Sequence, residues 1–212
     1  MEHFYPIFLD LKSKKCLVVG GGKVALRKVK SLLNCGASVT VVSPALTPEL
    51  QGMAVEEKIE YFKESYNHKH LERVFLVIGA TDDQDTNSTI AADCFSRNIM
   101  VNIADVPSLC NFIVPSLVSR GPLSIAISTE GKSPAFARLL KEELEQSFSE
   151  DHGEFVKFLG ELRPFIMEQV PDSQRKALFL KLAGEEFFKL FKTLPFEQLE
   201  QKAREVIDLY RS

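Results

Sequence analysis

Three consecutive glycines near the N-terminus form a site where the backbone could approach a ligand closely. They belong to the segment Gly20-Gly21-Gly22-Lys23-Val24-Ala25, which fits the pattern G-x-G-x-x-G/A. In that pattern the first glycine permits a tight turn, and the second lets a pyrophosphate lie against the backbone. The small last residue lets a helix pack closely on a strand. The segment therefore predicts a dinucleotide held by the free N–H groups at a helix start.

The residues around the glycines supply the strand and the helix that this motif requires. Before them, 16–19 is a continuous apolar run, as expected of a buried parallel strand. After them, apolar residues recur at helical spacing to Leu33, and Gly36 stands where a helix would end. The alternative is a glycine turn needed only for packing, and this context disfavours it.

The residues that follow the second predicted strand bear on which dinucleotide binds. That strand, 39–42, is followed by Ser43, Pro44 and Ala45 rather than by the Asp or Glu that normally holds the adenosine ribose. No arginine stands just beyond it to hold a 2′-phosphate. NAD is therefore favoured over NADP, with Ser43 as a weaker ribose contact.

The first half of the chain alternates predicted strands with helices. Five strands are expected, and a helix is expected near 84–97; the strands are 16–19, 39–42, 59–62, 74–78 and 99–103. This order is typical of an α/β fold with a doubly wound, Rossmann-type parallel sheet. We assign 1–112 to this NAD-binding domain.

The second half of the chain has a different pattern. Two strands are predicted at 113–116 and 123–128, then a helix from Ser133-Pro134 to about 147, and only amphipathic helices beyond it. We assign 113–147 to a small mixed α/β segment and 148–212 to a helical region. Because 113–147 is too short to enclose its own core, we expect it to form a homodimer interface.

Composition excludes several classes of function. The net charge of −3 and pI of about 5.9 give no basic footprint for nucleic acid. No signal peptide and no membrane-spanning apolar run is present, which predicts a cytoplasmic protein. None of the four cysteines forms a CxxC or CxxH pair, so no structural metal is expected, and Cys16 and Cys35 are expected in the core.

Seven segments spread over 6–142 identify a family more specifically than the glycines do. They are 6–11, 18–28, 36–44, Ala80-Thr81-Asp82-Asp83, 101–107, Phe112-Ile113-Val114-Pro115-Ser116 and 133–140. As an ordered set they resemble the precorrin-2 dehydrogenase family of siroheme synthesis. The resemblance implies a Rossmann domain, a dimerisation segment and a C-terminal helical region. It also implies oxidation of precorrin-2 to sirohydrochlorin by NAD⁺ and, in some members, insertion of Fe²⁺ as a second substrate.

The resemblance assigns roles to individual residues. The family's catalytic aspartate falls on Asp105, just after the fifth predicted strand; by residue type alone it would be a turn residue before Pro107. Motif and resemblance together assign the cofactor to Gly20, Gly21, Gly22, Lys23, Val24, Ser43, Pro44, Ala45, Thr81 and Asp82.

The substrate is rich in carboxylates, so its pocket should offer basic side chains. The expected substrate-binding residues are Asn102, Arg120, Ser128, Thr129, Lys132 and Arg138. Two alternatives stay open. The first is a non-catalytic NAD-sensing Rossmann module, because fold does not dictate function. The second is a bifunctional dehydrogenase and ferrochelatase, because one aspartate can serve both reactions.

Overall fold

The computed structural model describes residues 4–211 and divides the chain into two compact units, one ending at Val114 and one beginning at Pro115. Each unit has its own apolar clusters: two in the first unit, on the two faces of a sheet, and one in the second. Among the described helices, none is both long and apolar enough to cross a bilayer.

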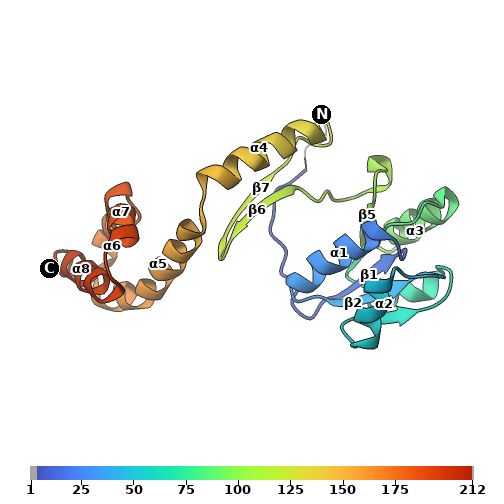
Figure 1. Ribbon diagram of the computed structural model, residues 1–212, viewed down its shortest axis with the longest axis horizontal. Coiled ribbons are helices and arrows are strands. Elements are labelled where there is room, and N and C mark those ends of the chain that lie inside the picture. Colours follow the sequence, from blue (N-terminus) through green and yellow to red (C-terminus); the bar gives the residue numbers. More distant parts are fainter. Residues whose placement is uncertain (1–3, 212) are drawn as a thin grey trace. The chain divides into compact units, whose positions relative to one another are not determined.

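The first unit is built on a five-stranded parallel sheet (Figure 1). Its strands are β1 (Lys15–Val19), β2 (Ser38–Val42), β3 (Glu60–Phe62), β4 (Leu76–Gly79) and β5 (Met100–Ile103). The central strands β1, β2 and β4 are almost continuously apolar and buried, because helices cover both faces of the sheet.

The two faces of the sheet carry different helices. Successive side chains of a strand point to opposite faces, so Val18 packs in the same cluster as α1 (Lys23–Asn34) and α2 (Pro48–Val55). Leu17 points the other way and packs in the cluster of α3 (Gln84–Ser96). Two short 3₁₀ helices, η1 (His68–Leu71) and η2 (Pro107–Leu109), complete this unit.

The strand order β3-β2-β1-β4-β5 reverses direction at β1. Val18 of β1 is paired with Val41 on one side and with Ile78 on the other. In open sheets of this kind, ligands bind beyond the carboxyl ends of the strands at this reversal. The predicted α/β fold class is confirmed.

The second unit contains an antiparallel hairpin followed by helices. The hairpin pairs β6 (Ser116–Arg120) with β7 (Leu123–Ile127). The helices are α4 (Pro134–Ser147), α5 (Glu150–Gln169), α6 (Asp172–Leu182), α7 (Glu185–Thr193) and α8 (Phe196–Asp208). As predicted, Ser133 caps α4: its Oγ accepts the N–H of Phe136 at 3.3 Å, and Pro134 follows it.

Several details differ from the sequence-based expectation. The strand expected at 113–116 instead begins at Ser116, after Pro115, which has no N–H to donate to a ladder. The helix α2 was not predicted, because only Leu50 of its eight residues is buried and it shows no apolar stripe. Cys16 is buried as expected, but Cys35 is exposed, because it ends α1 at the surface.

Candidate functional site

The glycine turn after β1 lies between the ends of neighbouring strands. Gly20 donates its N–H to the carbonyl of Val42 at 2.9 Å, and its φ of +124° is one that glycine adopts without strain. A Cβ on Gly20 would collide with the carbonyl of Ala80, in the loop after β4. Gly20 therefore lets the chain turn where β2 and β4 both approach β1.

The next two glycines have opposite surroundings. A Cβ on Gly21 would collide with the carbonyl of Ala45, and the carbonyl of Gly21 accepts the N–H of Thr47 at 2.9 Å. By contrast, a Cβ on Gly22 would meet none of the described atoms within 4 Å. The space beside Gly21 is therefore filled by protein backbone, whereas the space beside Gly22 is open to a ligand.

The start of α1 has the features of an anion site. Gly22 is its N-cap, and no side chain of residues 4–211 caps the helix. The first helical bond runs from Leu26 N–H to Gly22 carbonyl at 3.0 Å, so the N–H groups of Lys23, Val24 and Ala25 point out of the helix end. Its first turn holds no acidic residue. Free N–H groups, the positive end of the helix dipole and open space at Gly22 fit a pyrophosphate.

The loop after β2 folds against this turn. Ser43 is buried, donates its hydroxyl to the carbonyl of Ala45 at 2.7 Å, and accepts the hydroxyl of Tyr61 on its own carbonyl at 3.0 Å. Pro44 and Ala45 are exposed. The Ser43 oxygen therefore holds the loop shape, and its contact with a ribose stays a prediction.

The loop after β4 is held by a residue that sequence reasoning missed. Asn87 of α3 is buried and donates from Nδ2 to the carbonyl of Thr81 at 2.9 Å. The N–H of Asp83 is donated to Thr81 Oγ1 at 3.2 Å. Asp83 also caps α3, and its bonds to the amides of Thr86 and Asp85 lower its carboxyl pKa. Thr81 is half-buried and Asp82 exposed, both at the same sheet edge as the glycines.

Asp105 lies in the turn that follows β5. Its φ is +61°, a left-handed conformation that Asp and Asn tolerate better than most residues. The preceding residue, Ala104, donates its N–H to the carbonyl of Gly79 at 2.8 Å, which joins this turn to the end of β4. Asp105 is exposed, so its carboxylate is available at the carboxyl edge of the sheet.

A thiol and an amide hold the turn of Asp105 from behind. Cys110 Sγ accepts the N–H of Ile103 at 3.2 Å and lies 3.3 Å from the carbonyl of Val106, so it joins both sides of the turn. Burial raises the pKa of this thiol. Asn102 donates from Nδ2 to the carbonyl of Phe112 at 3.0 Å. Substrate binding by Asn102 stays a prediction, since its amide is engaged here.

Three of the predicted substrate residues come together in one loop of the second unit, between β7 and α4. Ser128 Oγ accepts the N–H of Glu130 at 3.0 Å, and Thr129 Oγ1 accepts the N–H of Ser133 at 3.2 Å. Lys132 Nζ pairs with Glu130 at 2.9 Å. On α4, Arg138 pairs with Glu142 at 3.0 Å, with its side chain largely exposed.

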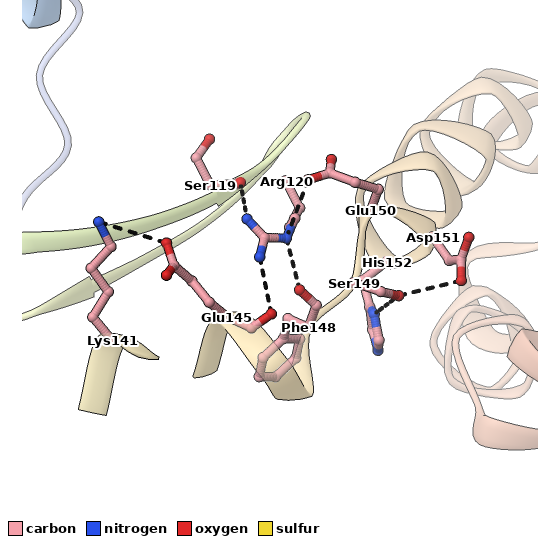
Figure 2. Close-up of polar contacts among 9 residues, drawn as sticks. All are labelled: Ser119, Arg120, Lys141, Glu145, Phe148, Ser149, Glu150, Asp151 and His152. Carbon is pink, nitrogen blue, oxygen red and sulfur yellow. Dashed lines mark hydrogen bonds and ion pairs between the residues drawn. The ribbon is translucent and has the colours of Figure 1, made fainter. Parts of the chain in front are cut away.

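Arg120 is not part of that loop. It ends β6 and pairs with Leu123, whereas the loop follows Ile127, at the opposite end of the hairpin. Its guanidinium donates to the carbonyls of Phe148 at 2.8 Å and of Ser119 and Glu145 at 3.0 Å, as Figure 2 shows. It also lies 3.4 Å from a carboxylate oxygen of Glu150. Arg120 thus joins the hairpin to the end of α4, and its role in substrate binding stays a prediction.

Residues 4–211 hold no group of three or more His, Cys, Asp or Glu side chains arranged to bind a metal ion. His70, at the 3₁₀ helix η1, accepts the N–H of Asn67 on Nδ1 at 3.1 Å and lies 2.8 Å from Glu64 through Nε2. These contacts give His70 a place in the cap of η1.

Comparison with known proteins identifies the family. Residues 7–116 match a family described as "Putative NAD(P)-binding", and residues 120–147 match "Sirohaem biosynthesis protein central". A solved structure titled "SirC, precorrin-2 dehydrogenase" superposes with a TM-score of 0.81 and 30% identity, covering 98% of this chain and 100% of the other. The chain belongs to the precorrin-2 dehydrogenase family.

Curated relatives of this family extend well beyond the segment matched by this chain. The siroheme synthase of Thioalkalivibrio sulfidiphilus is 42% identical over 83% of this chain and 36% of its own length. That of Methylobacillus flagellatus is 41% identical over 82% of this chain and 37% of its own length. The chain thus spans little more than a third of these relatives. The family resemblance inferred from the sequence is confirmed.

Proposed function

We propose that this protein oxidises precorrin-2 to sirohydrochlorin with NAD⁺. The observation that carries the proposal is the end-to-end similarity to SirC, named as a precorrin-2 dehydrogenase, in a chain that presents Asp105 and an open anion site at one sheet edge. The anion site fits the pyrophosphate of NAD⁺, and the loop 43–47 offers no charged side chain to a 2′-phosphate.

The reaction removes one hydride and one proton from a ring of the substrate. NAD⁺, when bound, accepts the hydride. Gly22 and the amides at the start of α1 hold and orient it, with Lys23, Val24, Ser43, Pro44, Ala45, Thr81 and Asp82 around it. Asp105 accepts the proton, because an exposed carboxylate at the sheet edge can act as a general base and pass that proton to water.

The proposal extends to substrate binding, assembly and location. The substrate is contacted by Asn102, Ser128, Thr129, Lys132 and Arg138. Arg120 is a sixth candidate for contact with the substrate. The chain is organised as 1–112, 113–147 and 148–212, and 113–147 forms a homodimer in the cytoplasm. Exposed apolar side chains at Leu117, Phe136 and Leu139 support an interface there.

Anaerobic turnover tests the reaction. Precorrin-2 and NAD⁺ are supplied without metal, and NADH and sirohydrochlorin are followed together by absorbance. We expect equal amounts of both products from the wild type, and at least a hundredfold lower rate from Asp105→Asn, since general-base catalysis contributes about 10²–10⁴-fold. Asparagine tolerates the left-handed backbone at this position, so the variant should fold and bind NAD⁺ like the wild type.

Other outcomes separate the alternatives. A wild type that binds NAD⁺ but forms neither product would establish the NAD-sensing module instead. Full activity in Asp105→Asn would remove Asp105 from the mechanism while leaving the dehydrogenase. Adding Fe²⁺ after sirohydrochlorin has formed tests whether iron is a second substrate, because siroheme then appears with its own absorbance.

A further inference from the structure

The helix α1 carries an unusual excess of positive charge. Its twelve residues include four basic and no acidic side chains; the basic ones are Lys23, Arg27, Lys28 and Lys30. Lys30 pairs with Glu49. Within residues 4–211, the other three side chains form no ion pair or hydrogen bond. The helix that follows the glycine turn therefore holds three cations without an anionic partner from the described chain.

Lys28 differs from the other cations of α1 in its surroundings. Lys23, Arg27 and Lys30 are exposed, whereas Lys28 is half-buried. Its ammonium lies within electrostatic range of the Asp105 carboxylate and the Cys110 thiol, both in the segment after β5. Lys28 thus lies near the segment that carries Asp105.

This environment is unfavourable for the cation as it stands. Burial is the main cause that lowers the pKa of Lys28, and repulsion from Arg27 adds to it. Attraction to Asp105 raises the pKa but has less effect than either. Taking a charge out of water is costly unless it is paired, and Lys28 has only part of its surface in water. Groups whose pKa is perturbed by burial together with a specific charged neighbour are candidates for functional sites.

We propose that the ammonium of Lys28 binds a peripheral carboxylate of the tetrapyrrole, beside Asp105. The inference rests on the proposed function, and it places a substrate contact on α1, outside the residues expected from the sequence. A carboxylate from the ligand would supply the direct ion pair that Lys28 lacks within the described chain, since Asp105 attracts it only from a distance. Lysine suits this role, because its flexible stem carries a point charge to a carboxylate in any orientation.

The cofactor phosphates are a poorer match for Lys28. They are accounted for by the open space at Gly22 and by the free amides of the first turn of α1. Lys28 lies in the next turn of the helix, within electrostatic range of the segment after β5. Substrate and cofactor can therefore be tested separately.

The test measures binding of sirohydrochlorin and of NAD⁺ to the full chain, by absorbance and fluorescence titration. Lys28→Met removes the charge and keeps an unbranched side chain. We expect its Kd for sirohydrochlorin to rise by about 10- to 100-fold, the loss of one charge-assisted hydrogen bond, while its Kd for NAD⁺ changes less than about twofold. Lys28→Arg keeps the charge and should restore most of the affinity.

Lys30→Met is the matched control. It removes the same charge from the same helix, but from an exposed site that already has Glu49 as a partner. We expect both dissociation constants to stay within about twofold of the wild type, since exposed pairs contribute little. We also expect Lys28→Met to melt no lower than the wild type, because it removes an unpaired buried charge.

Three results would overturn the proposal. Unchanged sirohydrochlorin affinity in Lys28→Met, or a wild type that does not bind sirohydrochlorin, means that Lys28 binds no substrate carboxylate. A selective rise in the Kd for NAD⁺ would assign Lys28 to the cofactor instead. These titrations need no turnover, so failure of the dehydrogenase reaction and failure of the Lys28 assignment are told apart.

Discussion

Gly21 and Gly22 are neighbours in the glycine turn, yet a methyl group would have opposite effects on them. At Gly21 it would collide with the carbonyl of Ala45, so the loop 43–47 would have to move. We expect Gly21→Ala to lower the free energy of unfolding by about 1 to 3 kcal/mol, the usual cost of overpacking. At Gly22 the methyl group meets no atom of residues 4–211 within 4 Å, and φ is −85°, so the fold should not change.

The cost at Gly22 should instead fall on the cofactor. A methyl group there occupies the space through which a pyrophosphate approaches the amides of α1. Urea denaturation and NAD⁺ titration of the two variants check this contrast. Gly22→Ala should unfold at the same urea concentration as the wild type. It should bind NAD⁺ at least about tenfold more weakly, because hydrogen bonds to the phosphates are lost. Normal NAD⁺ affinity in Gly22→Ala would place the cofactor elsewhere.

Among the elements, the junction of α4 and α5 depends on Arg120. Its guanidinium satisfies the carbonyls of Glu145 and Phe148, which the end of α4 leaves without helical partners (Figure 2). The carbonyl of Arg120 packs on Gly153 of α5, where a Cβ would collide with it. Arg120 therefore connects the end of the β6–β7 hairpin to both α4 and α5.

Replacing Arg120 should consequently destabilise the second unit. We expect Arg120→Met to lose about 2 to 4 kcal/mol of unfolding free energy, because several charge-assisted hydrogen bonds disappear and two partly buried carbonyls lose their donor. The control is Arg138→Met on α4, which loses one exposed pair with Glu142 and should change stability by less than about 0.5 kcal/mol. If Arg120→Met unfolds like the wild type but binds sirohydrochlorin weakly, the substrate role expected from the sequence is the correct one.

The elements also show what sequence patterns can and cannot predict. The strands of the parallel sheet were predictable, because a strand buried on both faces is a continuous apolar run, as in β1 and β4. The glycine turn followed from its position after β1, whereas β5, before the turn of Asp105, alternates in burial and the role of Asp105 came from the family resemblance. The helix α2 was missed because it buries only Leu50.

Contacts between distant segments were beyond the reach of the patterns. Nothing local in the sequence shows that Lys28 is half-buried within range of Asp105, or that Asn87 holds Thr81. Arg120 was grouped with Lys132 by chain proximity, but the hairpin register places it at the far end from the loop after β7. These features depend on packing and register, which local residue patterns do not specify.

At the scale of the whole molecule, one segment, 115–147, buries much less apolar surface than the rest of the chain. The helices α5–α8 share one apolar cluster, and the sheet of the first unit has one on each face. Between 115 and 147, by contrast, only Val118 and Ala137 are buried apolar side chains. Leu117, Phe136 and Leu139 in that range are exposed. A segment that buries so little by itself can gain stability by pairing with a second copy, and we expect this one to do so.

This leads to a prediction about assembly. Phe136 and Leu139 lie three residues apart on α4 and therefore share a face of the helix. We expect light scattering to show that the wild type has twice the 23.8 kDa mass of one chain. The double variant Phe136→Glu/Leu139→Glu should have the mass of one chain, because two unpaired carboxylates cannot be buried in an interface. Leu180→Glu is the control: Leu180 is 67% exposed on α6, so the variant should keep the wild-type mass. Two results would contradict this prediction: a wild type with the mass of one chain, or a double variant with the mass of two. Either would mean that this face of α4 does not form the dimer interface. Segment 115–147 would then have to be stabilised by the bound substrate or by another protein.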